Sequence, residues 1–325
     1  MLNLIQRIYS GKSGLWWLFW LMLPVQSQDL SNVSTATDPS PQHCDLIFYW
    51  QAEFSPEEQQ KIRQWLCVSY QQVNDFIGPY AAKTEVYLYR RDGAREPVPW
   101  ASTDRGGDQQ IRLQQLHFYV DPGYSLPLLF ADWTAVHEFS HLALPLLDRS
   151  DQWFAEGFAS YMQVQIQHQQ GFINDPRSYY RQKLQPQLGL LNQDQPMIPL
   201  LQRLMQERRY KAGYWGSALW FLEAEALLAE HGSDWSALIR QYQQQRRFQD
   251  QDLAAVIRSF DQLFTAAQTQ LQPIASKNVP AQINGQSQAT MSPKPLQQLW
   301  LRYQQQSATQ LLMQHPFALN KEKSN

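Results

Sequence analysis

Cysteine is scarce in this chain, because its 325 residues include only Cys44 and Cys67. Neither has another cysteine or a histidine pair beside it, which argues against a structural zinc site built on thiolates. In an oxidising compartment the two thiols can instead form a disulfide, which would contribute about 3 kcal/mol by restricting the unfolded chain. We therefore expect a Cys44–Cys67 bond, with two separately buried thiols as the alternative.

Excess charge of either sign is also lacking. The chain has 27 Lys and Arg residues against 29 Asp and Glu residues, a formal net charge of −2. Nucleic-acid partners are usually held by a basic surface, so this balance argues against such a partner. Hydrophobic residues make up 43% of the sequence and include twelve tryptophans, which allows a substantial core.

The apolar run near the amino terminus, residues 15–23, is too short for a comfortable membrane span. It follows a basic segment with Arg7 and Lys12, and small residues surround a cleavage position near Ser27. This order predicts an export signal over residues 1–27 and a periplasmic or secreted protein. No cysteine lies directly after the run, which argues against a lipoprotein anchor. An uncleaved signal anchor is the alternative, and only then would the protein be tied to a membrane.

The remaining sequence divides by composition. Residues 28–42 are rich in Ser, Thr, Asp, Asn and Pro and are interpreted as a linker. One folded domain is expected over residues 43–270. Residues 271–295 turn polar and contain prolines, so they are interpreted as a second linker. Residues 296–325 are expected to hold an amphipathic helix, which docks back on the domain, and a tail.

Strand patterns precede helical patterns within the domain. Strands are expected at residues 46–50, 84–89 and 111–120, with a helix from Pro56 to about Ile77 after the first. His117 lies in the third strand and is interpreted as a sheet residue rather than a metal ligand. Helical patterns then follow at 132–144, 151–168, 176–185, 196–209, 212–231, 233–247 and 250–270. The fold class predicted is α+β, with a small amino-terminal mixed sheet packed on a mainly helical half.

The motif that carries chemistry is His-Glu-x-x-His at residues 137–141. Residues four apart on a helix have Cβ atoms about 5–6 Å apart, so His137 and His141 can both bind one zinc ion. Glu138 would then lie beside the metal, where a general base acting on water is needed. Asp132 is a candidate helix N-cap before the motif. The alternative is an amphipathic core helix whose histidines only form hydrogen bonds.

A third protein ligand is expected, because a catalytic zinc ion usually has three. Glu156 lies in the segment Trp-Phe-Ala-Glu-Gly-Phe-Ala at residues 153–159, on the next predicted helix. This part of the helix is apolar nearly all round. A buried carboxylate needs a partner charge, and a metal ion can supply it.

Together, His-Glu-x-x-His and the Glu156 segment resemble the gluzincin zinc metallopeptidases. The similarity is greatest to the peptidase-MA-like group related to aminopeptidase N, because the gap between His141 and Glu156 is shorter than in aminopeptidase N itself. The resemblance covers about residues 125–232, a third of the chain, and implies that the domain expected over residues 43–270 is a zincin-like catalytic domain. It also implies one Zn²⁺ per chain held by His137, His141 and Glu156, with Glu138 as the base.

A second match is the Tyr-x-x-Gly segment that begins at Tyr210. It is similar to a segment of aminopeptidase N whose tyrosine stabilises the oxyanion of the reaction, so the resemblance implies this role for Tyr210. A phenolic hydroxyl is a suitable donor to a developing oxyanion on chemical grounds as well. Tyr214 lies one helical turn further on and is the alternative.

The Gly-x-Met-Glu-Asn segment, which grips the substrate's free amine in the aminopeptidases, is missing before His137. We therefore expect an exported zinc metallopeptidase that acts on peptides or proteins, more as an endopeptidase than as an aminopeptidase. The alternative is a catalytically silent zincin-fold module with a binding or assembly role in the cell envelope.

Overall fold

The computed structural model describes residues 44–80, 82–104, 113–275 and 294–315. The expected export signal, the first linker and most of the second linker lie outside these residues. Within the described ranges, none of the helices combines the length and hydrophobicity that a membrane span requires.

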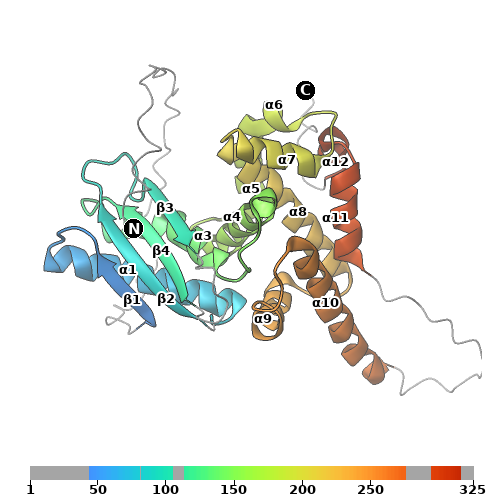
Figure 1. Cartoon of the computed structure of the whole chain (residues 1–325), viewed down its shortest axis with the longest axis horizontal. Helices are drawn as coiled ribbons and strands as arrows, with labels where there is room; N and C mark the ends of the chain where they lie inside the picture. Colours follow the sequence, from blue (N-terminus) through green and yellow to red (C-terminus); the bar gives the residue numbers. More distant parts are fainter. Residues whose placement is uncertain (1–43, 81, 105–112, 276–293, 316–325) are drawn as a thin grey trace, which may run out of the picture. The chain divides into compact units, whose positions relative to one another are not determined.

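Four strands form one mixed sheet in the order β1-β2-β4-β3 (Figure 1). Their bounds are β1 Leu46–Trp50, β2 Lys83–Arg90, β3 Trp100–Asp104 and β4 Leu113–Val120. The strands β1, β2 and β4 are parallel, and β3 pairs antiparallel with β4 at the edge. Strand β3 was not expected, because prolines and glycines on both sides of it make the segment look like a loop.

Helix α1, Pro56–Ile77, connects β1 to β2. Its start is the expected capping box: the Ser55 hydroxyl accepts from the Glu58 amide, and the Glu58 carboxylate accepts from the Ser55 amide at 2.8 Å. The bond between Cys44 and Cys67, whose Cα atoms are 5.5 Å apart, confirms the predicted disulfide. It ties the entry of β1 to the middle of α1.

An aromatic cluster joins the sheet to the helix with the two histidines. Trp65 of α1 packs on Phe118 of β4, with ring centroids 5.7 Å apart. Phe139 lies 6.1 Å from Phe118 and 5.3 Å from Tyr70, between the strand and α1. All four rings are buried. Burial of side chains of this size contributes about 2–3 kcal/mol each, so this core fixes the position of the histidine helix.

The described chain after β4 is helical (Figure 1). Its α-helices are α2 Leu126–Ala131, α3 Thr134–His141, α4 Gln152–Gln169, α5 Pro176–Leu184, α6 Leu188–Leu191, α7 Met197–Gln206, α8 Tyr210–Glu230, α9 Trp235–Gln245, α10 Leu253–Ala275, α11 Pro295–Gln305 and α12 Ala308–Gln314. Helix α4 packs against α3 and α8, and α8 also contacts α7 and α11. The α+β class with a small mixed sheet and a mainly helical half is confirmed.

The carboxyl-terminal helices attach to α8 and α10 through two buried acids. Asp261 of α10 accepts hydrogen bonds from the amides of Leu296 and Gln297, at 3.0 and 2.9 Å, and so caps the start of α11. Glu223 of α8 accepts from the Tyr303 hydroxyl at 3.0 Å and forms an ion pair with Arg302. These contacts hold α11 against the domain.

Candidate metal centre

Helix α3 presents both histidines of the motif on one face, with ring centroids 4.9 Å apart and nearly perpendicular planes. Its eight residues are all buried. A helix this short is not stable by itself, so its geometry must be imposed by contacts with the rest of the fold.

One nearby side chain and two side chains from distant segments provide those contacts. The Asp132 carboxylate accepts from the Thr134 amide at 2.8 Å, just before the helix. At the other end, the Tyr80 hydroxyl donates to the carbonyl of Phe139 at 2.6 Å, and Arg247 Nε donates to the carbonyl of Leu142 at 2.6 Å. These bonds satisfy polar groups at the ends of the helix and hold it between α1, the sheet and the segment after α9.

The imidazoles of α3 converge on one oxygen of α4. Glu156 Oε2 lies 3.1 Å from His137 Nε2 and 3.5 Å from His141 Nε2. All three side chains are buried. A carboxylate oxygen and two imidazole nitrogens are a donor set that zinc accepts, and the fold brings them together from two helices.

Two carboxylates flank the histidine pair. The ligand atoms of His137, Glu138 and His141 also lie within 4.8 Å of one another. However, Glu138 Oε2 accepts a 2.7 Å hydrogen bond from the hydroxyl of Thr103 on β3. The same hydroxyl is 3.2 Å from the Glu138 carbonyl. Glu138 is therefore oriented toward the edge strand, whereas Glu156 is oriented toward both imidazoles.

A glutamine contacts the other nitrogen of the first histidine. Gln163 Oε1 lies 3.3 Å from His137 Nδ1 and can accept a proton held there, so a metal ion could take the place of the Nε2 proton. Burial raises the pKa of the Tyr179 phenol on α5, and Gln163 offsets part of this rise.

The site is electrostatically suited to a cation. Burial raises the pKa of Glu156, but the charge of His141 and hydrogen bonds from both imidazoles outweigh burial and hold this pKa far below its ordinary value. Burial lowers the pKa of His137, but the Glu156 carboxylate outweighs burial and raises it. A buried carboxylate anion is therefore stabilised by positive charge, which a divalent metal ion in the same place would also supply.

Close packing of α4 on α8 depends on Gly157, next to Glu156. A Cβ atom at Gly157 would lie 2.5 Å from Ser217 Cβ and 2.8 Å from the Ser217 carbonyl carbon. No side chain fits there without moving the backbone of α8. This contact sets the distance between the helix that carries Glu156 and the helix that carries the two candidate tyrosines.

The structure places the two tyrosines differently. The Tyr214 ring is half-buried, with its centroid 5.8 Å from that of His137. Burial, and then the charges of Glu156 and Glu138, raise its pKa well above the ordinary value. Tyr210 is exposed at the start of α8, and its ring centroid lies 6.0 Å from that of Tyr214. Of the two tyrosines, Tyr214 is thus the one whose ring lies near His137.

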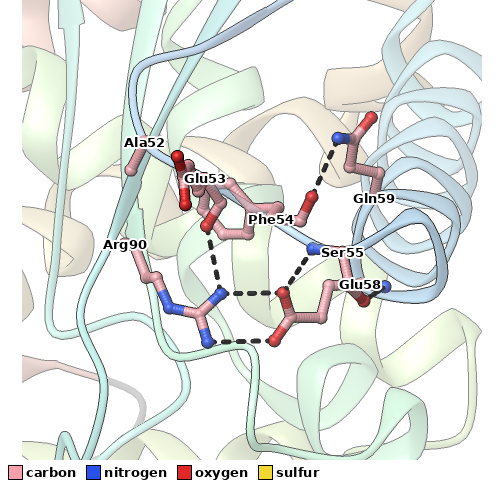
Figure 2. A pocket seen from close by; sticks show the side chains of 7 residues that line it. All are labelled: Ala52, Glu53, Phe54, Ser55, Glu58, Gln59 and Arg90. Atoms are coloured by element: carbon pink, nitrogen blue, oxygen red, sulfur yellow. Dashed lines mark hydrogen bonds and ion pairs between the residues drawn. The ribbon is translucent and has the colours of Figure 1, made fainter.

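A surface pocket lies elsewhere, where β1 leads into α1 (Figure 2). It is lined by Ala52, Glu53, Phe54, Ser55, Glu58, Gln59 and Arg90. Arg90 binds both carboxylate oxygens of Glu58, at 2.7 and 3.1 Å, and donates to the Glu53 carbonyl at 3.2 Å. The charged side chains of this pocket, Arg90 and Glu58, thus bind each other and join the end of β2 to the start of α1.

Two polar residues at the site were missed by reasoning from sequence. Gln163 lies seven residues after Glu156, two turns along the same face of a helix, and this spacing could have identified it. Thr103 gave no such signal, because its strand was interpreted as a loop. By contrast, His117 lies in β4 as expected, stacked on the Tyr87 ring at 4.9 Å and away from the histidine helix.

Comparison with known proteins adds distant structural similarities. No protein-family model matches the sequence, and no curated protein matches it. An M1 zinc metallopeptidase of Deinococcus radiodurans is 16% identical, with a TM-score of 0.41 over 69% of this chain and 46% of that one. A mutant M1 zinc metallopeptidase of the same organism, bound to a Tyr-Ser-Ala substrate, is 15% identical, with a TM-score of 0.41 over 73% of this chain and 49% of that one. This chain thus spans about half the length of these structures.

Proposed function

We propose that this protein is an exported zinc-dependent peptidase with one Zn²⁺ per chain, bound by His137, His141 and Glu156. The observation that supports the ligand set is the approach of both Nε2 atoms to Glu156 Oε2, at 3.1 and 3.5 Å, inside a buried site. The hydrogen bond between His137 and Gln163 presents the correct nitrogen to the metal.

Glu138 is the proposed general base. When bound, a zinc ion polarises a substrate carbonyl and lowers the pKa of water toward about 7. Glu138 then accepts a proton from the attacking water and later delivers it to the leaving amine. The hydrogen bond from Thr103 keeps this carboxylate turned toward the edge strand and away from the ligand position.

A tyrosine of α8 is the proposed oxyanion donor. The short distance between the rings of Tyr214 and His137 supports Tyr214, whereas the Tyr-x-x-Gly match supports Tyr210. Single replacements by phenylalanine distinguish them. The variant that lacks the true donor should lose about 10²–10³-fold in kcat, and the other should lose much less.

The substrate is proposed to be a peptide or protein cleaved internally, because the chain lacks the amine-gripping segment described above. The Cys44–Cys67 bond supports an oxidising compartment, outside the cytoplasm. Cleavage-site mapping by mass spectrometry on an unstructured protein tests the first point. Stepwise trimming from the amino terminus would contradict internal cleavage while leaving the metal chemistry intact.

Glu138→Gln is the variant that tests the proposal most directly. It keeps the shape of the side chain and all three ligands, so it should retain about one zinc ion per chain while losing at least about a hundredfold in activity. His141→Ala removes a ligand and should lose both. Elemental analysis and hydrolysis of a quenched peptide library provide the two measurements.

Two results would contradict this function. Freshly folded parent protein without stoichiometric metal would refute the metal site. A parent that binds zinc but hydrolyses no more than Glu138→Gln would instead favour the silent zincin-fold module.

A further inference from the structure

A tryptophan beside the proposed metal centre takes no part in the proposed reaction. Trp133 directly precedes α3, and 38% of the residue is exposed. Its ring centroid lies 5.1 Å from that of His137, and the two ring planes meet at 87°. A single exposed apolar side chain is common in proteins, so the significance of Trp133 depends on its surroundings.

The helix before Trp133 adds apolar surface. Pro127, Leu128 and Ala131 of α2 are exposed, and 46% of Leu128 is exposed. Leu128 and Ala131 are three residues apart, so they lie on the same side of this helix. The chain that leads into the histidine helix thus leaves several apolar side chains in solvent. Groups of exposed apolar residues mark sites of interaction more often than single ones do.

Aromatic rings also cover the first histidine. His137 is itself only 2% exposed. The half-buried Tyr214 ring lies 5.8 Å from His137 at an interplanar angle of 32°, and Tyr210, which is 45% exposed, lies 6.0 Å beyond Tyr214. Aromatic rings therefore provide surface that solvent can reach beside this histidine.

The distance from Trp133 to His137 limits which part of a substrate could contact the tryptophan. Successive residues of an extended peptide are about 3.3–3.6 Å apart. The 5.1 Å between the two ring centroids therefore corresponds to a step of one or two residues. A side chain that reaches Trp133 while its peptide is held at the metal centre would belong to a residue directly beside the cleaved bond.

We propose that Trp133 determines substrate specificity of the peptidase by binding a large apolar or aromatic side chain next to the cleaved peptide bond. This inference rests on the proposed function. An indole ring offers a wide apolar surface, and aromatic side chains pack on it edge-on or in offset stacks. A cationic side chain can also bind an indole face, but the exposed neighbours of Trp133 on α2 are apolar, which favours an apolar side chain.

Peptides that differ in one residue test the preference. Phenylalanine, leucine, arginine, glutamate and alanine are placed in turn on each side of the cleaved bond in a peptide that the parent hydrolyses. On one of the two sides, we expect kcat/KM to be at least about tenfold higher with phenylalanine or leucine than with alanine. A parent that cleaves all these peptides equally well, or that prefers arginine, would overturn the inference.

Three variants test the residue itself. Trp133→Ala should reduce the ratio of kcat/KM between the phenylalanine and alanine peptides to less than about threefold, and Trp133→Phe should retain part of it. Phe172→Ala is the matched control, because Phe172 lies just after α4 and is 39% exposed, and it should leave the ratio unchanged. A purely structural role of Trp133 would lower kcat/KM for every peptide alike. A ratio that persists in Trp133→Ala would refute the assignment.

Binding separates this inference from the proposed function. If the parent hydrolyses no peptide, the peptidase proposal fails, and binding of fluorescently labelled phenylalanine and alanine peptides is then compared by anisotropy. Binding of the phenylalanine peptide that is at least about tenfold tighter, lost in Trp133→Ala and kept in Phe172→Ala, would support the contact on its own. Equal binding of the two peptides to the parent would refute it.

Discussion

The stability of the carboxyl-terminal helices should depend on pH through His315. This residue follows α12 and is buried, and its Nε2 donates to the Leu219 carbonyl at 3.4 Å. Burial, together with the charge of Arg302, lowers its pKa to about 4 from an ordinary value of 6.5. Glu223 Oε1 lies 3.9 Å away, but that carboxylate is already compensated by Arg302 and bound to the Tyr303 hydroxyl.

The sign of the effect follows from which state binds the proton. Above about pH 6.5 the imidazole is neutral in both states and contributes no pH dependence. Between about pH 6.5 and 4 only the unfolded chain gains the proton, so the free energy of unfolding falls as the pH falls. At about 1.4 kcal/mol per pKa unit, the total loss is roughly 3 kcal/mol for a group moved from 6.5 to about 4.

Urea denaturation across pH 4–7 measures this loss. His315→Gln keeps an amide donor for the Leu219 carbonyl but cannot be protonated, so the difference in unfolding free energy between parent and variant should change by about 2–3 kcal/mol over the range. His231→Gln replaces an exposed histidine and serves as the control. Its free energy of unfolding should keep the pH dependence that we attribute to His315. A difference between parent and His315→Gln that stays flat with pH would refute the reasoning.

Two further predictions concern the disulfide and the glutamine at the metal centre. Replacing Cys44 and Cys67 together by serine should lower the free energy of unfolding by about 3 kcal/mol without removing zinc, and mass mapping of the exported protein that found two free thiols would contradict the bond. Gln163→Leu removes the hydrogen-bond acceptor beside His137 Nδ1, so it should weaken zinc binding about 10–100-fold, measured by competition with a chelator. An unchanged zinc affinity would contradict the role assigned to the Gln163 amide.

Local sequence was sufficient for most of the helices and for the disulfide, but it did not predict α2 or α6, and it predicted α11 and α12 as one helix. Around the two histidines and around Glu156, apolar residues recur at the spacing of a helix, and this pattern can be read from the sequence alone. Helices α3 and α4 lie where the pattern predicts them. Even so, α3 ends at His141, three residues before the expected end at 144. The amides of residues 142–144 donate to carbonyls three residues earlier in the chain, not four, so the α-helical pattern stops there.

Contacts between segments far apart in the sequence could not be predicted in this way. The bond from Thr103 to Glu138 requires an edge strand whose flanking prolines and glycines conceal it. The choice between Tyr210 and Tyr214 depends on how α8 rotates against α3, and no periodicity in the sequence fixes that rotation.

The hydrogen bonds that hold α3 have a consequence for the order of folding. Thr103, Tyr80 and Arg247 reach the helix from positions 35, 59 and 105 residues away along the chain. Closing loops of this length costs entropy before any contact compensates it. The histidine pair therefore becomes ordered only after distant segments have come together, so a metal ion would bind the completed fold. In this respect the site differs from a zinc finger, in which the metal itself drives folding.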